Sequence, residues 1–209
     1  PLRHAVRGGS RPPLFLVHPV GGTVSCYLDL AEGLDGGRAV YGLQAPGLDP
    51  EAAAAGRGLP EIAARYVAEL RRVQENGPYC LGGRSFGGDG DAIADAFLRD
   101  LLGGDTAAAG ALRELAAADP VEIRRLYGVF KTHARALRAY RPAACDLPVT
   151  LLRTAEAAEI DAACGWRGLA GGGLKVHAVP GNHYSLLRQP NLDACIALLD
   201  KALAGSVGA

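Results

Sequence analysis

A serine at the centre of a glycine-rich turn is the first residue of this sequence that could do chemistry. Ser85 lies in the pattern Gly83-x-Ser85-x-Gly87, directly after the short apolar run 79–81. A serine hydroxyl becomes an exposed nucleophile where a strand turns sharply into a helix, and flanking glycines let neighbouring backbone pass close to it. The chain has 29 glycines among 209 residues, so the pattern alone also fits an incidental glycine-rich turn. The rest of the chain must therefore supply a base and an oxyanion site.

His183 is the best candidate for the base that would take the proton of Ser85, because a free serine has little nucleophilicity at neutral pH. It follows the last apolar run, residues 174–179, in a loop. His18 is the second choice and is better placed to brace a loop than to act as the base. The other histidines lie in less suitable places: an N-terminal stretch (His4), the apolar face of a helix, where a buried core histidine is expected (His133), and a strand (His177).

A glycine pair after an early apolar run is the candidate oxyanion loop. Residues 14–17 have the length and composition of a buried strand, and residues 18–22 (His-Pro-Val-Gly-Gly) follow them. A tight turn of this kind can point backbone N–H groups at a ligand, and residues 24–34 then have helical apolar spacing. An ordinary strand-to-helix turn is the alternative interpretation. The loop around Val20 is therefore a donor site only if the other parts converge on it.

The remaining pattern predicts an α/β fold with a mostly parallel sheet flanked by helices. Further strands are expected at residues 39–43, 79–81, 148–152 and 174–179, and helices at residues 60–73 and 191–204. Ser85, His183 and the loop at Val20 each follow a strand, so we expect them at one carboxyl edge of the sheet. A serine that precedes the histidine in the chain is the order of α/β-hydrolases.

The alternation of strands and helices breaks after Gly88. A helix and a strand are expected there, but Asp89 leads into three helical segments at residues 92–102, 106–117 and 120–140. Asp105 and Asp119 are candidate N-caps of the second and third segments. Helices inserted beside a nucleophile are typical of a mobile lid, here about residues 89–140, although plain helical packing explains them equally well.

The acid that would orient the histidine is not assigned by the sequence. Such a carboxylate commonly ends one of the strands that follow the nucleophile, and the first of these strands is missing from the pattern. Asp89 and Asp91 lie too near the serine and are typical of turn and helix-cap residues. Asp161, in the loop after the strand at 148–152, is a possible substitute, although a solvated loop aspartate is the simpler interpretation.

Composition excludes several classes of partner. The 22 basic and 22 acidic side chains balance, without a basic block that would bind nucleic acid or an anionic membrane. No run reaches the roughly 18 apolar residues of a membrane span, and no export signal is recognisable. The five cysteines lack metal-ligand spacing and predict reduced core residues in a cytoplasmic protein without a metal site. A chain without methionine suggests a piece of a longer protein.

Four blocks in order closely resemble one family, the thioesterase domains that end nonribosomal peptide synthetases and related polyketide assembly lines. The blocks are residues 13–22, 40–48, 82–88 and 179–183, and the resemblance covers nearly the whole chain. It implies the α/β-hydrolase fold in a single domain over residues 1–209, with Ser85 as nucleophile and His183 as base. It also implies that the backbone N–H groups of Val20 and Phe86 form the oxyanion hole.

The same resemblance implies a chain-terminating thioesterase without a bound cofactor. Its substrate would be a peptidyl or depsipeptidyl thioester on the phosphopantetheine arm of a carrier protein domain in the same polypeptide, released by macrocyclisation, with or without prior oligomerisation, or by hydrolysis. The alternatives are a free-standing editing thioesterase or esterase, and a catalytically dead module that docks a carrier domain. The family has a helix and a strand ending in the triad aspartate after the nucleophile, so we expect a segment missing between Gly88 and Asp89.

Overall fold

The computed structural model describes residues 2–6, 9–48, 58–84, 119–154 and 161–205. The chain forms two compact units. The first comprises Pro1–Glu32 and Gly36–Tyr140, and the second comprises Gly33–Asp35 and Arg141–Ala209.

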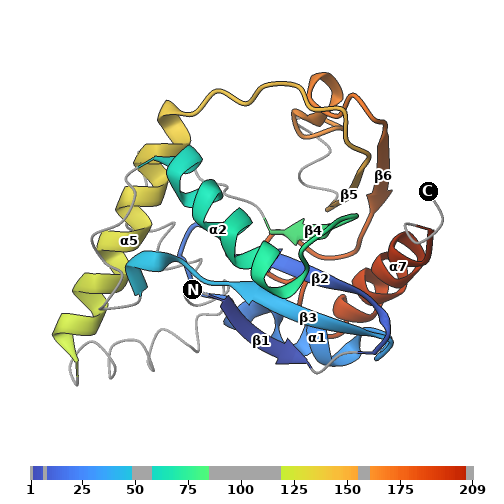
Figure 1. The fold of residues 1–209 in the computed structure, drawn as a ribbon, viewed down its shortest axis with the longest axis horizontal. Coiled ribbons are helices and arrows are strands. Elements are labelled where there is room, and N and C mark those ends of the chain that lie inside the picture. The colour runs from blue at the N-terminus through green and yellow to red at the C-terminus, as the bar shows by residue number, and fades with distance from the viewer. Residues whose placement is uncertain (1, 7–8, 49–57, 85–118, 155–160, 206–209) are drawn as a thin grey trace. The chain divides into compact units, whose positions relative to one another are not determined.

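A four-stranded sheet is the centre of the first unit (Figure 1). Its strands are β1 (Leu2–Val6), β2 (Arg11–Val17), β3 (Arg38–Leu43) and β4 (Cys80–Gly83), in the order β1-β3-β2-β4. β2 runs parallel to both β3 and β4, whereas β1 is antiparallel to β3. The carboxyl ends of β2, β3 and β4 therefore meet at one edge, as the sequence predicts.

The N-terminal residues form more structure than the sequence predicts, since no element is predicted over residues 1–13. β1 occupies residues 2–6 as an edge strand, and β2 begins at Arg11 rather than at Leu14. A short strand that contains Arg3 and His4 has a weak apolar pattern, so its pairing with β3 defines it. The two prolines at residues 12–13 mask the start of β2, because proline lacks the backbone N–H that a ladder uses.

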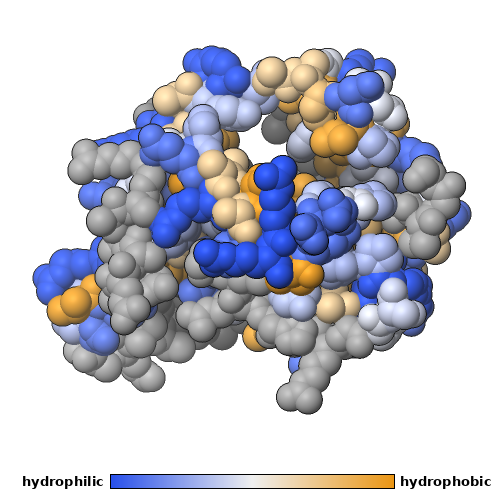
Figure 2. Space-filling model, viewed as in Figure 1, coloured by the Kyte–Doolittle hydropathy of each residue, from blue (hydrophilic) through white to orange (hydrophobic). Residues whose placement is uncertain are grey.

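Helix α2 (Leu59–Val73) covers part of this sheet. It begins with a proline in its first turn, as expected, and buries Ile62, Tyr66 and Leu70 along one face. These side chains form a core cluster with Phe15 of β2 and Leu43 of β3, both of which are fully buried. In Figure 2, hydrophilic residues (blue) cover much of the face on which α2 lies, and hydrophobic residues form small separate groups.

Short turns and two helices follow the strands of the first unit. Short 3-10 turns at Ser25–Tyr27 and Pro46–Leu48 follow β2 and β3, and helix α1 (Leu28–Gly33) continues from the first turn. Helix α5 (Pro120–Ala139) begins at Asp119, whose carboxylate accepts a hydrogen bond from the Glu122 N–H at 2.9 Å. The predicted cap Asp119 and the predicted helix at residues 120–140 are thus confirmed, and a role of this helix in a lid stays a prediction.

The second unit contains a parallel pair of strands and the last helix. β5 (Val149–Arg153) pairs with β6 (Leu174–Ala178), and α7 (Leu192–Ala204) buries Leu192 and Cys195. All these elements match the sequence expectation to within a residue or two. No ladder between described residues joins this pair to the four-stranded sheet, and the described residues between β4 and β5 form no strand.

Some expectations fall on residues that the structure does not describe. The helices expected at residues 92–102 and 106–117, the cap Asp105 and the junction of Gly88 with Asp89 lie outside the described ranges. The cysteines are free thiols, as expected, but their predicted core placement holds only for Cys195. Cys145 and Cys164 are exposed, and Cys26 and Cys80 are half-buried. Cys164 follows a loop aspartate in an exposed turn, so its apolar sequence neighbours do not bury it.

Candidate active site

The loop after β2 is the best-described part of the candidate site. His18, Pro19 and Val20 are buried directly beyond the end of the strand. The Gly22 N–H donates to the Pro19 carbonyl at 2.9 Å, which closes a tight turn. Gly22 has φ +88°, and a Cβ at this position would collide with Ala45 and Val129, so both backbone conformation and packing require glycine.

His18 makes two short hydrogen bonds that determine which nitrogen carries its proton. Its Nδ1 lies 2.5 Å from the Pro19 carbonyl oxygen, and its Nε2 lies 2.6 Å from the Tyr66 hydroxyl. A carbonyl oxygen only accepts, so we assign the proton to Nδ1, and Nε2 then accepts from the tyrosine. The Nε2 lone pair of His18, the second-choice base, therefore already accepts a hydrogen bond from Tyr66.

Burial keeps the His18 imidazole neutral. Desolvation lowers the pKa of His18 to about 4, against the opposing effect of its hydrogen bond to Pro19, and nearby His133 lowers it further. The two imidazole rings stack with centroids 4.9 Å apart. Desolvation also lowers the pKa of His133 and raises the pKa of Tyr66. Three buried rings therefore stay uncharged around the loop.

These contacts hold the peptide groups on both sides of Val20. The Pro19 carbonyl, which accepts from His18 Nδ1, belongs to the same planar peptide group as the Val20 N–H. Fixing the carbonyl of a trans peptide also fixes the opposite direction of its N–H. The Val20 carbonyl accepts from His133 Nδ1 at 3.0 Å. The loop can therefore present the Val20 N–H in one fixed direction, as an oxyanion donor requires.

His133 comes from helix α5, where sequence reasoning places it as a buried core histidine. It is 4% exposed, and its Nδ1 donates to the Val20 carbonyl. Sequence reasoning anticipates that His18 braces the loop, but it does not identify Tyr66 or the contact between His133 and Val20. The sequence signal for both Tyr66 and His133 is a polar group on the apolar face of a helix. A buried hydroxyl or imidazole needs a hydrogen-bond partner, so such a residue indicates a contact elsewhere in the fold.

Tyr27 is a second residue that sequence reasoning missed. Its hydroxyl donates to the Val17 carbonyl and accepts from the Arg84 N–H, both at 2.7 Å. Val17 ends β2, and Arg84 directly precedes Ser85. Ser85 and Phe86 themselves lie outside the described residues, so their roles as nucleophile and oxyanion donor remain predictions. The described range that contains β4 ends at Arg84, the residue before the serine.

The glycines before the serine differ in what they require. A Cβ at Gly82 would come within 2.9 Å of the Leu16 Cδ2 atom, so the end of this buried side chain would have to shift. A Cβ at Gly83 would meet the Val17 carbonyl oxygen at 3.6 Å, an ordinary contact. At the end of β4, a side chain at position 82 would therefore disturb the packing against β2 more than one at position 83.

His183 lies in a well-connected loop of the second unit, directly after β6. The Asn182 side-chain oxygen accepts from the Tyr184 and Ser185 N–H groups, each at 3.0 Å, and Asn191 donates to Ser185. The His183 ring is half-buried and lies edge-on to the Tyr184 ring, with ring centroids 5.1 Å apart. Because these bonds fix the turn on both sides of His183, its backbone is held as a positioned base requires. Its role as the base remains a prediction.

Asp161 caps its own loop. One carboxylate oxygen accepts from the Ala163 N–H at 2.9 Å, and the other accepts from the Gly165 N–H at 2.5 Å. These bonds, that to Ala163 first, lower the pKa of the exposed Asp161. The geometry matches the solvated loop aspartate of the simpler interpretation, and a role as the triad acid would require other bonds. The acid stays unassigned.

The described residues hold no group of three or more histidine, cysteine, aspartate or glutamate side chains that could bind a metal ion. None of the described helices combines the length and the apolar character needed to cross a membrane. The described chemistry is therefore that of the loop at Val20, the end of β4 and the His183 turn.

Comparison with known proteins finds similarity to one family over the part of the chain that contains β2, β3 and β4. Residues 12–89 match the model of the thioesterase domain family. The chain is 50% identical over 80 residues to malpinin synthetase of Mortierella alpina, covering 38% of the chain and 1% of that protein. It is 42% identical over 89 residues to a dimodular nonribosomal peptide synthase of Bacillus subtilis, covering 43% of the chain and 4% of that protein. The chain thus spans only a few per cent of these relatives.

Solved structures extend the likeness to almost the full chain. The thioesterase domain of NocB, from the nocardicin cluster, is 28% identical with a TM-score of 0.70, over 97% of this chain and 98% of that one. A four-domain nonribosomal peptide synthetase bound to AMP and glycine is 26% identical with a TM-score of 0.82, over 96% of this chain and 20% of that one. The Vlm2 thioesterase domain, at 23% identity and a TM-score of 0.69, shares the fold over 96% of both chains.

Proposed function

The resemblance to the thioesterase domains of nonribosomal peptide synthetases holds over nearly the whole chain, with the α/β-hydrolase fold, and from this premise we propose that the protein releases the finished chain from such a synthetase. The enzyme is a serine hydrolase acting on thioester bonds. Its substrate is a peptidyl or depsipeptidyl chain on the phosphopantetheine of a carrier domain in the same polypeptide. The large synthetases to which the chain is similar support that partner.

Acylation of Ser85 is the first step. The Ser85 Oγ attacks the thioester carbonyl carbon while its proton passes to the His183 imidazole. The resulting oxyanion accepts hydrogen bonds from the Val20 and Phe86 N–H groups. The intermediate then collapses, the C–S bond breaks, and the phosphopantetheine sulfur leaves with the proton from His183. The chain is now an ester of Ser85.

Release is the second step. Water or a nucleophile of the bound chain gives its proton to His183 and attacks the ester carbonyl, the C–O bond to Ser85 breaks, and the serine recovers the proton. Attack by the chain's own nucleophile gives a macrocycle, directly or after oligomerisation, and attack by water gives a linear acid. Exclusion of water over the ester favours the cyclic product. The cytoplasm is the proposed compartment, since free thiols suit reducing surroundings.

The braced loop at Val20 is the observation that carries this proposal. Both peptide groups next to Val20 are held by buried imidazoles, so an N–H donor at this position is oriented before substrate arrives. Donors that need no reorganisation stabilise an oxyanion more than mobile ones, and removal of one such donor typically costs about 10²- to 10³-fold in kcat. A module that only docks a carrier domain has no need of this arrangement.

Serine-directed labelling tests the proposal. We expect a fluorophosphonate probe to label the wild-type protein and the Ser10→Ala control, in which an exposed serine is removed. Ser85→Ala should lose both labelling and acylation by a peptidyl thioester that mimics the carrier arm, because no oxygen nucleophile remains. Labelling that persists in Ser85→Ala would overturn the assignment.

Turnover of matched thioesters separates the alternatives. The proposed enzyme should process a carrier-bound peptidyl thioester faster than the same acyl group on a free thiol, with cyclic and linear products distinguished by mass. Equal rates on both would favour a free-standing editing thioesterase. Binding of the carrier domain without any product would favour a catalytically dead docking module.

A further inference from the structure

The last rung of the ladder between β2 and β4 lies directly before the candidate catalytic residues. Val17 pairs with Gly83 in a parallel register. His18, the next residue of the first strand, donates its N–H to Leu43 of β3 at 3.1 Å, so the Val17 carbonyl points the opposite way, toward β4. The next N–H along β4 is that of Arg84. These two backbone groups stand where the ladder ends.

The Tyr27 hydroxyl bridges these two groups. It accepts from the Arg84 N–H and donates to the Val17 carbonyl, each at 2.7 Å, so one oxygen joins the two strand ends. Tyr27 is 3% exposed, at the end of the 3-10 turn Ser25–Tyr27 that follows the oxyanion loop. A buried hydroxyl with both a donor and an acceptor satisfied is locked in place.

We propose that Tyr27 is a positioning residue that sets the distance between the oxyanion loop and the nucleophile. Val17 precedes the loop at His18, and Arg84 precedes Ser85, so the hydroxyl fixes the two backbones one residue before each functional element. This role rests on the proposed function for the part that Ser85 plays. Two bonds through one oxygen can span a wider gap than a direct ladder bond of about 2.9 Å, and so can keep the strand ends apart.

The spacing between the ends of β2 and β4 matters because the reacting carbonyl group must reach the oxyanion loop and the nucleophile at the same time. Its carbon has to approach the Ser85 oxygen while its oxygen meets the loop donors, about 3 Å from each. Closing the ladder by a direct bond, or opening it with water, would move Arg84, the residue that precedes Ser85 in the sequence. Displacement of a catalytic group by about 1 Å can cost about 100-fold in rate.

Tyr27→Phe is the matched test, because it removes the hydroxyl and keeps the ring. We expect kcat for acylation by a carrier-mimic peptidyl thioester to fall about 10- to 100-fold, with KM changed by less than about twofold, since substrate binding does not use the hydroxyl. Tyr79→Phe is the control, because the Tyr79 hydroxyl bonds only locally among its described contacts, to the exposed Glu75 carbonyl at 3.0 Å. Its kcat should stay within about twofold. An unchanged kcat in folded Tyr27→Phe would overturn the proposal.

Amide exchange gives a readout that does not depend on turnover. In Tyr27→Phe, exchange of the Arg84 N–H, followed by NMR, should accelerate at least about tenfold, while Tyr79→Phe leaves it unchanged. If the wild-type protein neither turns over nor takes the fluorophosphonate label, the proposed function fails, and this exchange still decides the bridge. Unchanged Arg84 exchange in Tyr27→Phe would show that the hydroxyl does not hold the strand end.

Discussion

The neutral state of His18 allows the two hydrogen bonds by which it holds the loop at Val20. Its Nδ1–H donates to the Pro19 carbonyl, and its Nε2 accepts from the Tyr66 hydroxyl, so the ring uses one donor and one acceptor. A second proton would convert Nε2 into a donor facing the tyrosine oxygen, in surroundings that do not solvate the charge. Ring chemistry and burial therefore select the same protonation state, and the peptide before Val20 keeps its orientation while that state lasts.

Acid should therefore destabilise the protein through His18. The pKa of His18 is about 4 in the fold and near 6.5 when the chain is unfolded. Between these values the unfolded chain binds more protons, so stability decreases as the pH falls from about 6.5 to about 4. The contribution of this one group approaches about 3 kcal/mol at the acid end of the window. His133, whose pKa is also lowered, adds a loss of the same sign.

The variant His18→Asn isolates this contribution, because asparagine does not titrate. Urea unfolding at pH 7 and pH 4.5 should give a smaller acid-induced loss of free energy for His18→Asn than for the wild type. We also expect His18→Asn to be less stable at pH 7, since the hydrogen bonds to Pro19 and Tyr66 are lost or changed. An equal pH dependence in the two proteins would contradict the assignment of a buried neutral imidazole.

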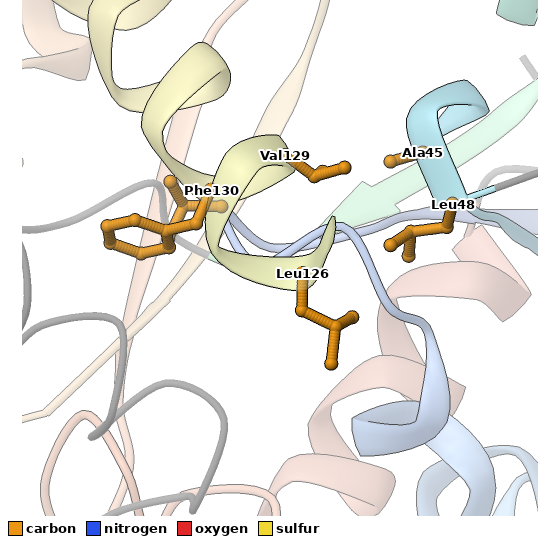
Figure 3. Close-up of a cluster of buried hydrophobic side chains, with 6 residues drawn as sticks. Ala45, Leu48, Leu126, Val129 and Phe130 are labelled. Carbon is orange, nitrogen blue, oxygen red and sulfur yellow. The ribbon is translucent and has the colours of Figure 1, made fainter. Parts of the chain in front are cut away.

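At the scale of elements, helix α5 is anchored in the core of the first unit. Figure 3 shows Leu126, Val129 and Phe130 of α5 in one cluster with Ala45 and Leu48, which follow β3. Polar contacts support the same side: Arg125 donates to the Leu48 carbonyl and pairs with Glu122 at 2.7 Å, and His133 donates to Val20. Helix α5, the described helix of the expected lid, thus packs as an ordinary core helix.

Truncation of Phe130 should therefore destabilise the fold. Phe130 is 2% exposed, and Phe130→Ala should lower the free energy of unfolding by about 3 to 5 kcal/mol, through lost burial and the cavity left behind. Val121→Ala on the same helix is the control, because Val121 is 69% exposed and its removal should cost no more than about 0.5 kcal/mol. Similar small effects in both variants, measured by urea unfolding, would mean that α5 moves as a mobile lid helix.

The sequence predicts the elements of this fold better than the contacts between them. Apolar runs and glycine pairs locate β2, β3, β4 and α2, because one face of each is buried and local composition records it. β1 is missed, since pairing defines an edge strand. Tyr27, Tyr66 and His133 are missed as site residues because their partners lie 10 to 113 positions away in the chain. Hydrogen bonds of that range leave no local pattern.

At the scale of the whole molecule, the strands are divided between two units. The described ladders form a four-stranded sheet in the first unit and a parallel pair in the second, and none joins β4 to β5. The resemblance to α/β-hydrolases implies a strand that ends in the triad aspartate between β4 and β5. A missing segment after Gly88 would explain why the sequence shows no such strand, and this remains a prediction. β4 is accordingly an edge strand among the described residues, with Leu81 58% exposed.

Among the described residues, each unit has its own hydrogen-bonded ladder, and we expect the two units to unfold separately. Trp166 is the only tryptophan of the sequence and lies in the second unit, so its fluorescence reports that unit alone. Among the described helices, α2 and α5 of the first unit contribute most to the far-UV circular dichroism, with 15 and 20 residues against 13 in α7. We expect the fluorescence transition at lower urea, because the second unit is small and small units bury a smaller share of their surface.

Paired variants make the assignment of each transition specific. Leu192→Ala removes a 3% exposed side chain from α7 and should move the Trp166 transition to lower urea, leaving the main dichroism transition in place. Leu70→Ala removes a 6% exposed side chain from α2 and should do the reverse. If both variants moved both transitions together, the units would unfold as one cooperative body. A packed interface would then have to couple them, since the described strands share no hydrogen-bonded ladder across the two units.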